Sequence, residues 1–358
     1  MLNPLLYYIK NKGKGLLLLF AIVVCVLGVV FVSTIILSIS DTCKPLMVYP
    51  YENFTAVRLL NDDKPDAESE LSEKAALSDC IPMKVSVFDF KLITVSSSSM
   101  IMNFEDKTDI GVIMDKCAVQ LTEGVLPEKG KNEIIVHENI LKNKKLKLGD
   151  ELNSYKITGA FSGKPVFGLG YMDSTAAEEE FKQPRTYIVF ADNDVRSRLK
   201  ELSADDWKVY TIDDANQDLD NSFSDLNLIL AISIIMLTIS ISIAIAALVF
   251  SQYASRYDEF AILNTIGYKK KSIIALIIKE ILIISIVGWA IGYGLALLGI
   301  WLVYINVYRN TGQTMNIFNI VALKYSFVPL ICSVLFTLIP TTRKICKTDL
   351  ISIIERRN

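Results

Sequence analysis

Four stretches of the sequence contain no Asp, Glu, Lys or Arg over lengths that can cross a lipid bilayer. They are residues 15–40, 226–255, 281–308 and 325–342, which contain 26, 30, 28 and 18 residues. A membrane-spanning helix needs about 20 mostly apolar residues. Pro329 and Pro340 interrupt the last stretch, but helices in lipid tolerate proline, and residues 320–339 complete the span. The sequence therefore predicts four transmembrane α-helices.

The charged residues divide the chain into two parts. Residues 41–225 carry 22 Lys and Arg against 34 Asp and Glu, a net charge of −12, whereas the rest of the chain carries +10. A polar segment of this length can fold around a core of its own. We therefore predict a membrane protein with a large α+β extracytoplasmic domain between the first and second spans. The acidity of this domain argues against nucleic acid as a partner.

Short patterns inside this domain indicate both strands and helices. The candidate strands are residues 84–90, 133–136, 155–161, 185–190 and 207–212, and the candidate helices are 139–146 and 194–202. Residues 61–79 are polar and acid-rich, so we expect a loop or a short exposed helix there. The glycines between 159 and 170 are expected to form a mobile turn around Pro165.

Catalytic and cofactor chemistry has little support in this chain. His137 is the only histidine, which excludes a metal site built from several histidines. No cysteine pair has the CxxC spacing, and the glycine-containing stretch 124–131 lacks the spacing and the Ser or Thr of a phosphate-binding P-loop. We therefore predict a non-enzymatic chain with no catalytic residue, no metal and no cofactor of its own. Cys43, Cys80 and Cys117 are an odd number, so either all three are reduced or buried, or one disulfide forms.

Positive charge in the short loops sets the orientation. The segments before the first span, between the second and third, and after the fourth carry 3, 5 and 5 Lys and Arg, whereas the third-to-fourth loop carries Arg309 and Lys324. Because cytoplasmic loops are enriched in Lys and Arg, we predict a multi-pass plasma-membrane protein with both termini in the cytoplasm. The predicted segments are a membrane-surface helix at 1–14, spans at 15–40, 226–255, 281–308 and 320–342, the outer domain at 41–225, a coupling loop at 256–280, an outer loop at 309–319 and a tail at 343–358.

A seven-residue spacing of apolar residues precedes the second span. Ile212, Leu219 and Leu226 are spaced by seven, and Phe223 lies four residues after Leu219. This a/d pattern is typical of a stalk between subunits, but an amphipathic helix packed on its own domain gives the same pattern. Both interpretations remain open at this point.

The inner loop between the second and third spans carries the most specific signal. Phe260, Leu263 and Ile266 are spaced by three, which predicts a short amphipathic helix that ends at Gly267. Lys269, Lys270 and Lys271 follow, at the negative end of the helix and near the anionic leaflet. A short helix with an apolar face outside the bilayer core needs a protein partner or a place in the lipid interface.

This loop resembles the FtsX/MacB-type ABC-transporter permease family. The residues that carry the resemblance are Arg256, Asp258, Glu259, residues 261–267, Lys269 to Lys271 and Glu280, with Asn264 departing from the usual basic residue. The tail from Pro340 is similar to the family's C-terminal motif, although Leu350 replaces its proline. Residues 121–152, with Gly124, Pro127, Glu133 and Gly149, are similar to the MacB core domain.

The resemblance implies a permease subunit that binds two separately encoded ABC ATPase subunits, which hold the ATP and Mg, and pairs with an identical or related permease. Its docking residues are then Arg256, Asp258, Glu259, Phe260, Leu263, Ile266, Gly267 and Lys269. The implied function is MacB-like: ATP hydrolysis in the partner moves the outer domain, for export or removal of a peptide, antibiotic or lipid-linked substrate. The alternative is an FtsX-like signalling subunit that activates an extracellular cell-wall hydrolase or senses a ligand without transport.

Small residues recur on the third span. Gly288, Gly292 and Ala296 form a small-xxx-small row, which permits close approach of another helix in lipid. The row predicts either the dimer face between two permeases or packing within one chain.

Overall fold

The computed structural model describes residues 11–60, 67–75, 80–93, 95–172, 186–190, 193–202 and 204–347. The chain forms two compact units. The membrane unit contains Met1–Leu37, Leu226–Val303 and Asn316–Asn358, and the outer unit contains Ser38–Asp225 and Tyr304–Met315. The predicted surface helix at 1–14 and the tail at 343–358 lie largely outside the described residues.

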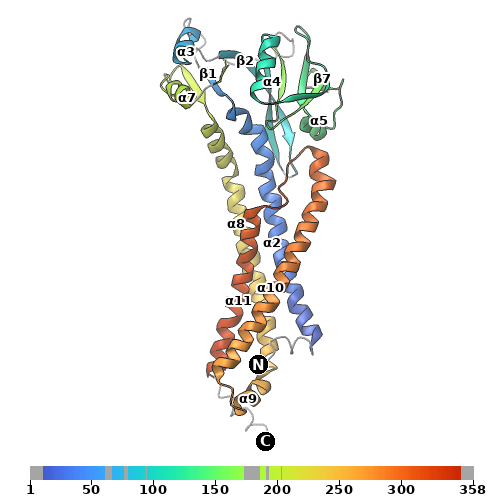
Figure 1. The fold of residues 1–358 in the computed structure, drawn as a ribbon, viewed down its shortest axis with the longest axis vertical. Coiled ribbons are helices and arrows are strands. Elements are labelled where there is room, and N and C mark those ends of the chain that lie inside the picture. Colours follow the sequence, from blue (N-terminus) through green and yellow to red (C-terminus); the bar gives the residue numbers. More distant parts are fainter. Residues whose placement is uncertain are drawn as a thin grey trace. The chain divides into compact units, whose positions relative to one another are not determined.

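Long helices make up the membrane unit (Figure 1). They are α2 (Lys12–Met47), α8 (Ile212–Ala254), α10 (Lys270–Val303) and α11 (Ile320–Lys347), with the short helix α9 (Tyr257–Thr265) between α8 and α10. Among the described residues, four helical segments are long and apolar enough to cross a membrane: Lys12–Met47, Ile212–Ala254, Lys270–Thr311 and Ile320–Arg343. The third begins at Lys270 rather than at 281, because Lys270, Lys271 and Lys279 lie within α10 and do not interrupt it.

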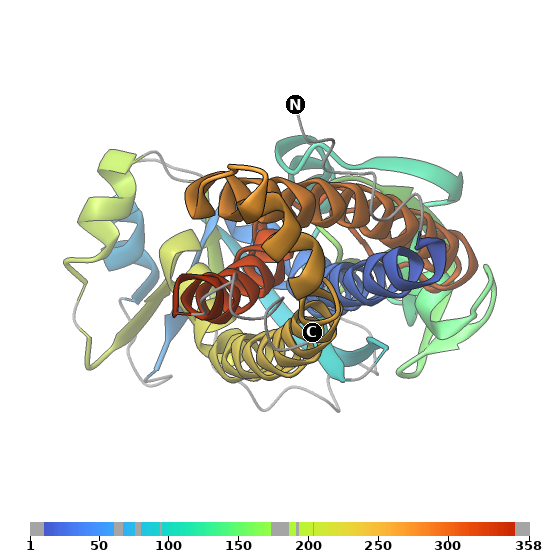
Figure 2. The same ribbon diagram turned by 90° about the horizontal axis from the view of Figure 1, so that it is seen from below.

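The small-residue row of α10 packs against α2 in the same chain. A Cβ added at Gly288 would lie 2.8 Å from Ile22, and one at Gly292 would lie 2.8 Å from the carbonyl oxygen of Val23. Ala296 is 1% exposed. Figure 2 shows the orange α10 beside the blue α2. The structure shows that this row packs against α2 within the protomer, and its role as a dimer face stays a prediction.

A mixed sheet forms the outer unit. The strands within the described residues are β1 (Thr55–Leu59), β2 (Cys80–Lys91), β3 (Ser96–Phe104), β4 (Gln120–Gly124), β5 (Glu133–His137), β6 (Glu151–Leu152), β7 (Tyr155–Ser162), β8 (Gly168–Tyr171), β9 (Thr186–Val189) and β10 (Trp207–Tyr210). Their order is β10-β1-β9-β2-β3-β8-β5-β7-β4, and β6 pairs with β7. The pairs β3–β8 and β5–β7 are parallel and the other pairs are antiparallel.

Short helices cover two apolar clusters of this sheet. The helices are α3 (Ala67–Ala75), α4 (Lys107–Lys116), α5 (Glu138–Lys144) and α7 (Asn193–Leu199). Ile110 and Ile113 of α4 are buried in the larger cluster, with Phe104, Phe161 and Phe167 from the strands and the turn before β8. The second cluster lies under α3 and α7, which are side by side in Figure 1, and includes Leu71, Leu199 and Trp207. The predicted α+β fold between the first two long helices is therefore confirmed.

The glycines between 159 and 170 were expected in a mobile turn, and this expectation is wrong. Gly159 lies in β7, and Gly168 and Gly170 lie in β8. A Cβ at Gly168 would lie 3.0 Å from Ile101, and one at Gly170 would lie 2.7 Å from Asn103. These glycines allow close packing of neighbouring strands, a use that Gly has when backbones approach each other.

The predicted a/d pattern before the second span is used inside the chain. Helix α8 begins after Thr211, whose backbone N–H donates to Asp214 at 2.8 Å and whose hydroxyl donates to the same carboxylate at 2.7 Å. Leu219 is only 3% exposed. Since Leu219 is already buried, this part of α8 packs as an amphipathic helix on its own domain.

Candidate functional site: the α8–α9–α10 junction

Helix α9 has a defined beginning and end. Arg256 is its N-cap residue, and its carbonyl accepts the N–H of Phe260 at 3.1 Å. At the other end, the N–H of Tyr268 donates to the carbonyl of Leu263 and the N–H of Gly267 donates to Asn264. Gly267 has φ +104°. This bond pair is a Schellman motif, which favours glycine because an L side chain is strained at this φ. The sequence predicted this end of the helix at Gly267.

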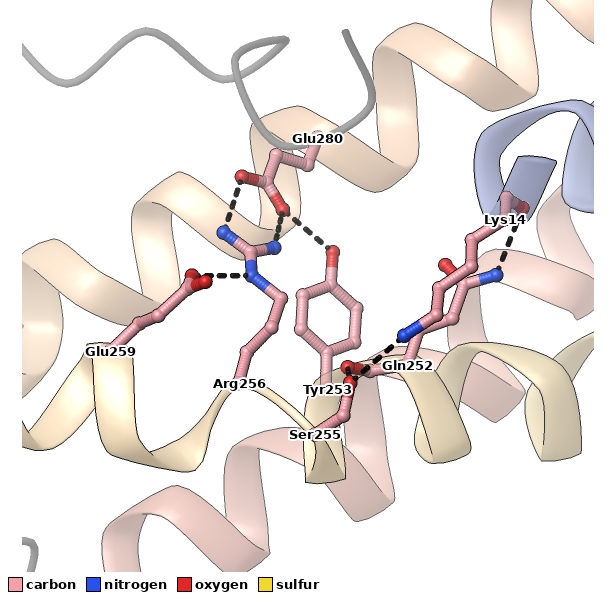
Figure 3. Close-up of polar contacts among 7 residues, drawn as sticks. All are labelled: Lys14, Gln252, Tyr253, Ser255, Arg256, Glu259 and Glu280. Carbon is pink, nitrogen blue, oxygen red and sulfur yellow. Dashed lines mark hydrogen bonds and ion pairs between the residues drawn. The ribbon is translucent and has the colours of Figure 1, made fainter. Parts of the chain in front are cut away.

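A buried ion pair fixes α9 to α10. Arg256 donates from Nη1 to Glu280 Oε2 at 2.7 Å and from Nη2 to Glu280 Oε1 at 3.2 Å (Figure 3). Arg256 is 5% exposed and Glu280 is 1% exposed. Burial opposes the charged form of Arg256, but its hydrogen bonds and attraction to Glu280 outweigh burial and raise its pKa. A bidentate pair of this kind fixes distance and orientation together, so the corner between α8 and α10 is held in one geometry.

Further hydrogen bonds and ring contacts involve Arg256 and Glu280. The hydroxyl of Tyr253, near the end of α8, donates to Glu280 Oε2 at 3.0 Å, and Arg256 Nε donates to Glu259 Oε2 at 3.1 Å. The Arg256 guanidinium carbon lies 5.5 Å from the ring centroid of Tyr253 and 5.1 Å from that of Phe260. The two rings are stacked with centroids 6.2 Å apart. Rings that face a guanidinium stabilise its charge where water is excluded.

The start of α2 is tied to the end of α8. Gln252 Nε2 donates to the carbonyl of Lys14 at 3.0 Å, and Lys14 Nζ donates to Ser255 Oγ at 3.4 Å (Figure 3). Ser255 Oγ in turn donates to the carbonyl of Gln252 at 2.7 Å. The junction therefore joins α2, α8, α9 and α10 within the membrane unit.

The predicted docking face of α9 is only partly at the surface. Phe260 is 0% exposed because it packs against Tyr253 and Arg256, and Leu263 is half-buried, whereas Ile266 is 70% exposed. The geometrical reason is that each step of three residues turns the helix by about 300°, so side chains at this spacing do not share one direction. Six residues turn the helix by about 600°, so Phe260 and Ile266 point about 120° apart. Predicting one face from these three residues was therefore wrong for Phe260.

The exposed apolar face of α9 has a different composition. Ile262 is 52% exposed and Ile266 is 70% exposed, and four residues separate them, which places them about 40° apart on the helix. Tyr268 adds a 39% exposed side chain just after the helix end. We call Ile262, Ile266 and Tyr268 the α9 apolar face. Asp258, Gly267 and Lys269 from the predicted docking set are also exposed beside it.

Sequence reasoning missed the role of Tyr253. Glu280 was matched to a family pattern, but its pairing with Arg256 joins positions 24 residues apart, and Tyr253 had no pattern of its own. A usable signal was present: Arg256 directly follows one long apolar segment and Glu280 directly precedes the next, and charges at such borders need partners.

His137 belongs to the fold of the outer unit. Its Nδ1 accepts the N–H of Asn139 at 3.0 Å, which makes it the N-cap of α5, and its Nε2 lies 3.1 Å from the carbonyl oxygen of Gly163. Burial lowers the pKa of His137 more than its bond to Gly163 raises it. No group of three or more His, Cys, Asp or Glu able to hold a metal occurs among the described residues.

The sequence of the membrane unit matches a known family. Residues 229–350 match the family model described as the FtsX-like permease C-terminal domain. This region contains most of α8 and all of α9, α10 and α11, including the junction described above. The chain is therefore a multi-pass membrane protein. More particularly, residues 229–350 are similar to the C-terminal domain of FtsX-like permeases.

Two solved structures are similar to part of the chain. One is the periplasmic region of MacB from Actinobacillus actinomycetemcomitans, with 12% identity, coverage of 51% of this chain and 97% of that chain, and a TM-score of 0.29. The other is the extracellular domain of the noncanonic ABC-type transporter YknZ from Gram-positive bacteria, with 10% identity, coverage of 48% and 95%, and a TM-score of 0.29. No curated protein matches the chain.

Proposed function

We propose that the chain is the permease subunit of a MacB-like ABC transporter, and that the α9 apolar face docks a separately encoded ATPase. The observation that carries this proposal is the pair of exposed isoleucines, Ile262 and Ile266, on a short helix whose other side is fixed by a buried ion pair. A rigid helix with exposed apolar anchors is suited to a groove on a partner protein. In this role the chain itself is non-catalytic, and ATP and Mg are bound by the partner.

The buried ion pair supports coupling as well as docking. Force applied to α9 by the ATPase reaches α10 through Arg256 and Glu280, and it reaches the start of α2 through Gln252 and Lys14. These contacts are short and satisfied, so motion of α9 moves the three long helices α2, α8 and α10 rather than α9 alone. Transmission of motion to the outer unit, followed by export or removal of a peptide, antibiotic or lipid-linked molecule, is the function we propose.

Orientation and assembly are part of the same proposal. The positive charge of the inner segments supports an orientation with α9 and both termini in the cytoplasm, where an ATPase finds ATP. Two ATPase subunits require two copies of α9, and hence a second permease, identical or related. The small-residue row of α10 is covered by α2, so we assign the contact between permeases to another face.

A pair of acidic substitutions tests docking. Ile262→Asp and Ile266→Asp should each separate the ATPase from the membrane complex, because interface anchors contribute about 2 kcal/mol or more, which weakens binding by more than tenfold. Lys270→Ala is the control, since screened charges at a rim contribute little. The readout is co-purification in detergent with the partner ATPase, plus ATP turnover. Retention of the ATPase by a normally inserted double variant would refute the proposal.

A further inference from the structure

A cavity in the outer unit lies between the end of α2 and the strands β2 and β3. Its volume is about 210 Å³. Leu46 and Met47, in the last turn of α2, form one wall. Val85, Val87 and Met100 also line it, and Val87 and Met100 are directly paired across β2 and β3. Two strands and a helix end therefore line a groove that is open to the outside.

Two tyrosines close one side of this cavity. Tyr51 and Tyr210 both line it, and their ring centroids are 4.8 Å apart in an edge-to-face arrangement. Tyr51 is in turn 5.5 Å from the fully buried Phe54, and the Tyr210 hydroxyl donates to Asp218 at 2.8 Å. These contacts fix both rings, so this wall is preformed.

The cavity lining carries no ionised group. The residues that line it are apolar, apart from Ser98, Ser99 and the two tyrosines. Burial raises the pKa of Tyr51 to about 12, so its phenol stays neutral at physiological pH. The hydroxyl of Ser99 already donates to the carbonyl of Val166 at 3.3 Å. A charged ligand would therefore lose its hydration here without gaining a partner.

The volume and the lining of the cavity favour an acyl chain over a peptide as its ligand. An engineered apolar cavity of ~150 Å³ binds benzene, so 210 Å³ holds about eight carbon atoms. A peptide segment brings N–H and C=O groups that need hydrogen-bond partners when buried, whereas an acyl chain needs none. Ser98 is exposed and lies where a polar head would remain in water.

We propose that this cavity binds an acyl chain, with about eight of its carbons between the end of α2 and the β2–β3 walls. The proposal rests on the proposed transport function only in naming the class of cargo, because binding itself requires no ATPase. The bound acyl chain belongs either to a bilayer phospholipid or to an acylated molecule that arrives from the aqueous side.

Photo-cross-linking tests the proposal on the full-length chain in lipid nanodiscs. One arm uses a diazirine fatty acid added to the aqueous phase, and the other uses a phospholipid with the diazirine in its acyl chain. Cross-linked peptides are identified by mass spectrometry. Labelling of Val87 or Met100 in either arm supports the site, and the arm that labels identifies the source. Labelling restricted to the membrane helices in both arms would overturn it.

Matched variants control for folding. Val87→Trp fills the cavity and should reduce labelling by about tenfold, because the indole ring takes the volume that the acyl carbons would occupy. Val125→Trp places the same ring on an exposed valine outside the cavity lining and should leave labelling unchanged; Val87 is 51% exposed and Val125 is 65% exposed. Equal labelling of Val87→Trp and Val125→Trp would overturn the proposal. ATPase co-purification is measured in parallel, so a failure of docking is recognised separately.

Discussion

Two polar regions hold the long helices, one at the α8–α9–α10 junction and one at the other end of α10. The junction uses charge: Arg256 and Glu280 form a bidentate pair with Glu280 1% exposed. The other region, residues 304–315, uses neutral groups and belongs to the outer unit. We call residues 304–315 the outer strap. The comparison shows that one protein anchors a helix with either a few strong contacts or several weak ones.

The outer strap is fixed by hydrogen bonds that are individually modest. The hydroxyls of Ser38 and Tyr308 are 2.5 Å apart, and the Thr42 hydroxyl donates to the carbonyl of Thr314 at 2.9 Å. Asn143 of α5 donates to the carbonyl of Thr311 at 3.0 Å. Each neutral bond contributes about 1 kcal/mol, whereas removal of one partner from a buried ion pair costs about 3–5 kcal/mol. Loss of one contact should therefore lower the free energy of unfolding only slightly in the outer strap and strongly at the junction.

The largest expected effect is at the junction. Glu280→Gln leaves the buried Arg256 with only the exposed Glu259 as a counter-charge, and we expect a loss of about 3–5 kcal/mol in the free energy of unfolding, measured by thermal denaturation in detergent. Glu259→Gln is the control: the Glu259 side chain is 58% exposed, so its loss should cost less than about 1 kcal/mol. An equal effect of the two substitutions would contradict the distinction between buried and exposed partners.

Removing both charges sharpens the same comparison. Arg256→Met combined with Glu280→Leu should be more stable than either single substitution, because no charge is then left unpaired in the interior. ATPase docking should nevertheless decrease, since α9 loses its fixed geometry. If the double variant is less stable than both single variants, packing rather than charge pairing governs the junction.

A glycine in the outer strap should give the next largest effect. Gly312 has φ +64°, and a Cβ there would collide with the backbone carbonyl of Asn139. Gly312→Ala should cost more than the roughly 1–2 kcal/mol of the left-handed conformation alone. Gly294→Ala in α10 is the matched control, because nothing lies within 4 Å of a Cβ at that position. The measurement is the thermal denaturation midpoint, and similar midpoints for the two variants would refute the close approach of strap and α5.

The amide of Asn143 tests the neutral contacts of the strap. Asn143 accepts from the N–H of Lys91 at 2.9 Å and donates to the carbonyls of Lys91 and Thr311 at 2.7 and 3.0 Å. Asn143→Ala should cost about 1–3 kcal/mol, less than Glu280→Gln. A larger loss than that of Glu280→Gln would reverse the ranking of the two regions.

The smallest expected effect is a pH dependence from His137. Burial depresses its pKa in the folded state below the ordinary value of about 6.5. The unfolded chain therefore binds a proton more readily, so stability is fully present above about pH 6.5 and falls as the pH falls toward the folded pKa. His137→Asn should remove this dependence while keeping an N-cap acceptor. An unchanged pH profile in that variant would assign the dependence to other groups.

The sequence predicted the junction better than the strap, for physical reasons. Gly267 predicted the end of the short helix, and the family resemblance singled out Arg256 and Glu280 as residues but did not predict that they pair. The strap joins Ser38, Thr42 and Asn143 to residues 304–315 by neutral side chains far apart in the sequence. No local periodicity marks such contacts. The predicted outer loop accordingly began at residue 309, whereas residues 304–308 also belong to the outer unit.

Two further errors have identifiable causes. The face of α9 was assigned from a spacing of three, which drifts around the helix, and this drift placed the buried Phe260 among the exposed residues. Strand β8 was missed because Gly168 and Gly170 disfavour strands, yet they fit between Ile101, Asn103 and Ile134. In both cases packing against residues distant in the sequence decided the outcome.

Site-specific photo-cross-linking tests the central claim that the α9 apolar face contacts the ATPase. A photoreactive amino acid is placed at Ile266, 70% exposed, or at Ile286, a 56% exposed isoleucine of α10, in cells that also produce the partner ATPase. We predict a cross-link to the ATPase from position 266 and none from position 286. No cross-link from 266, or equal cross-links from both positions, would contradict the account.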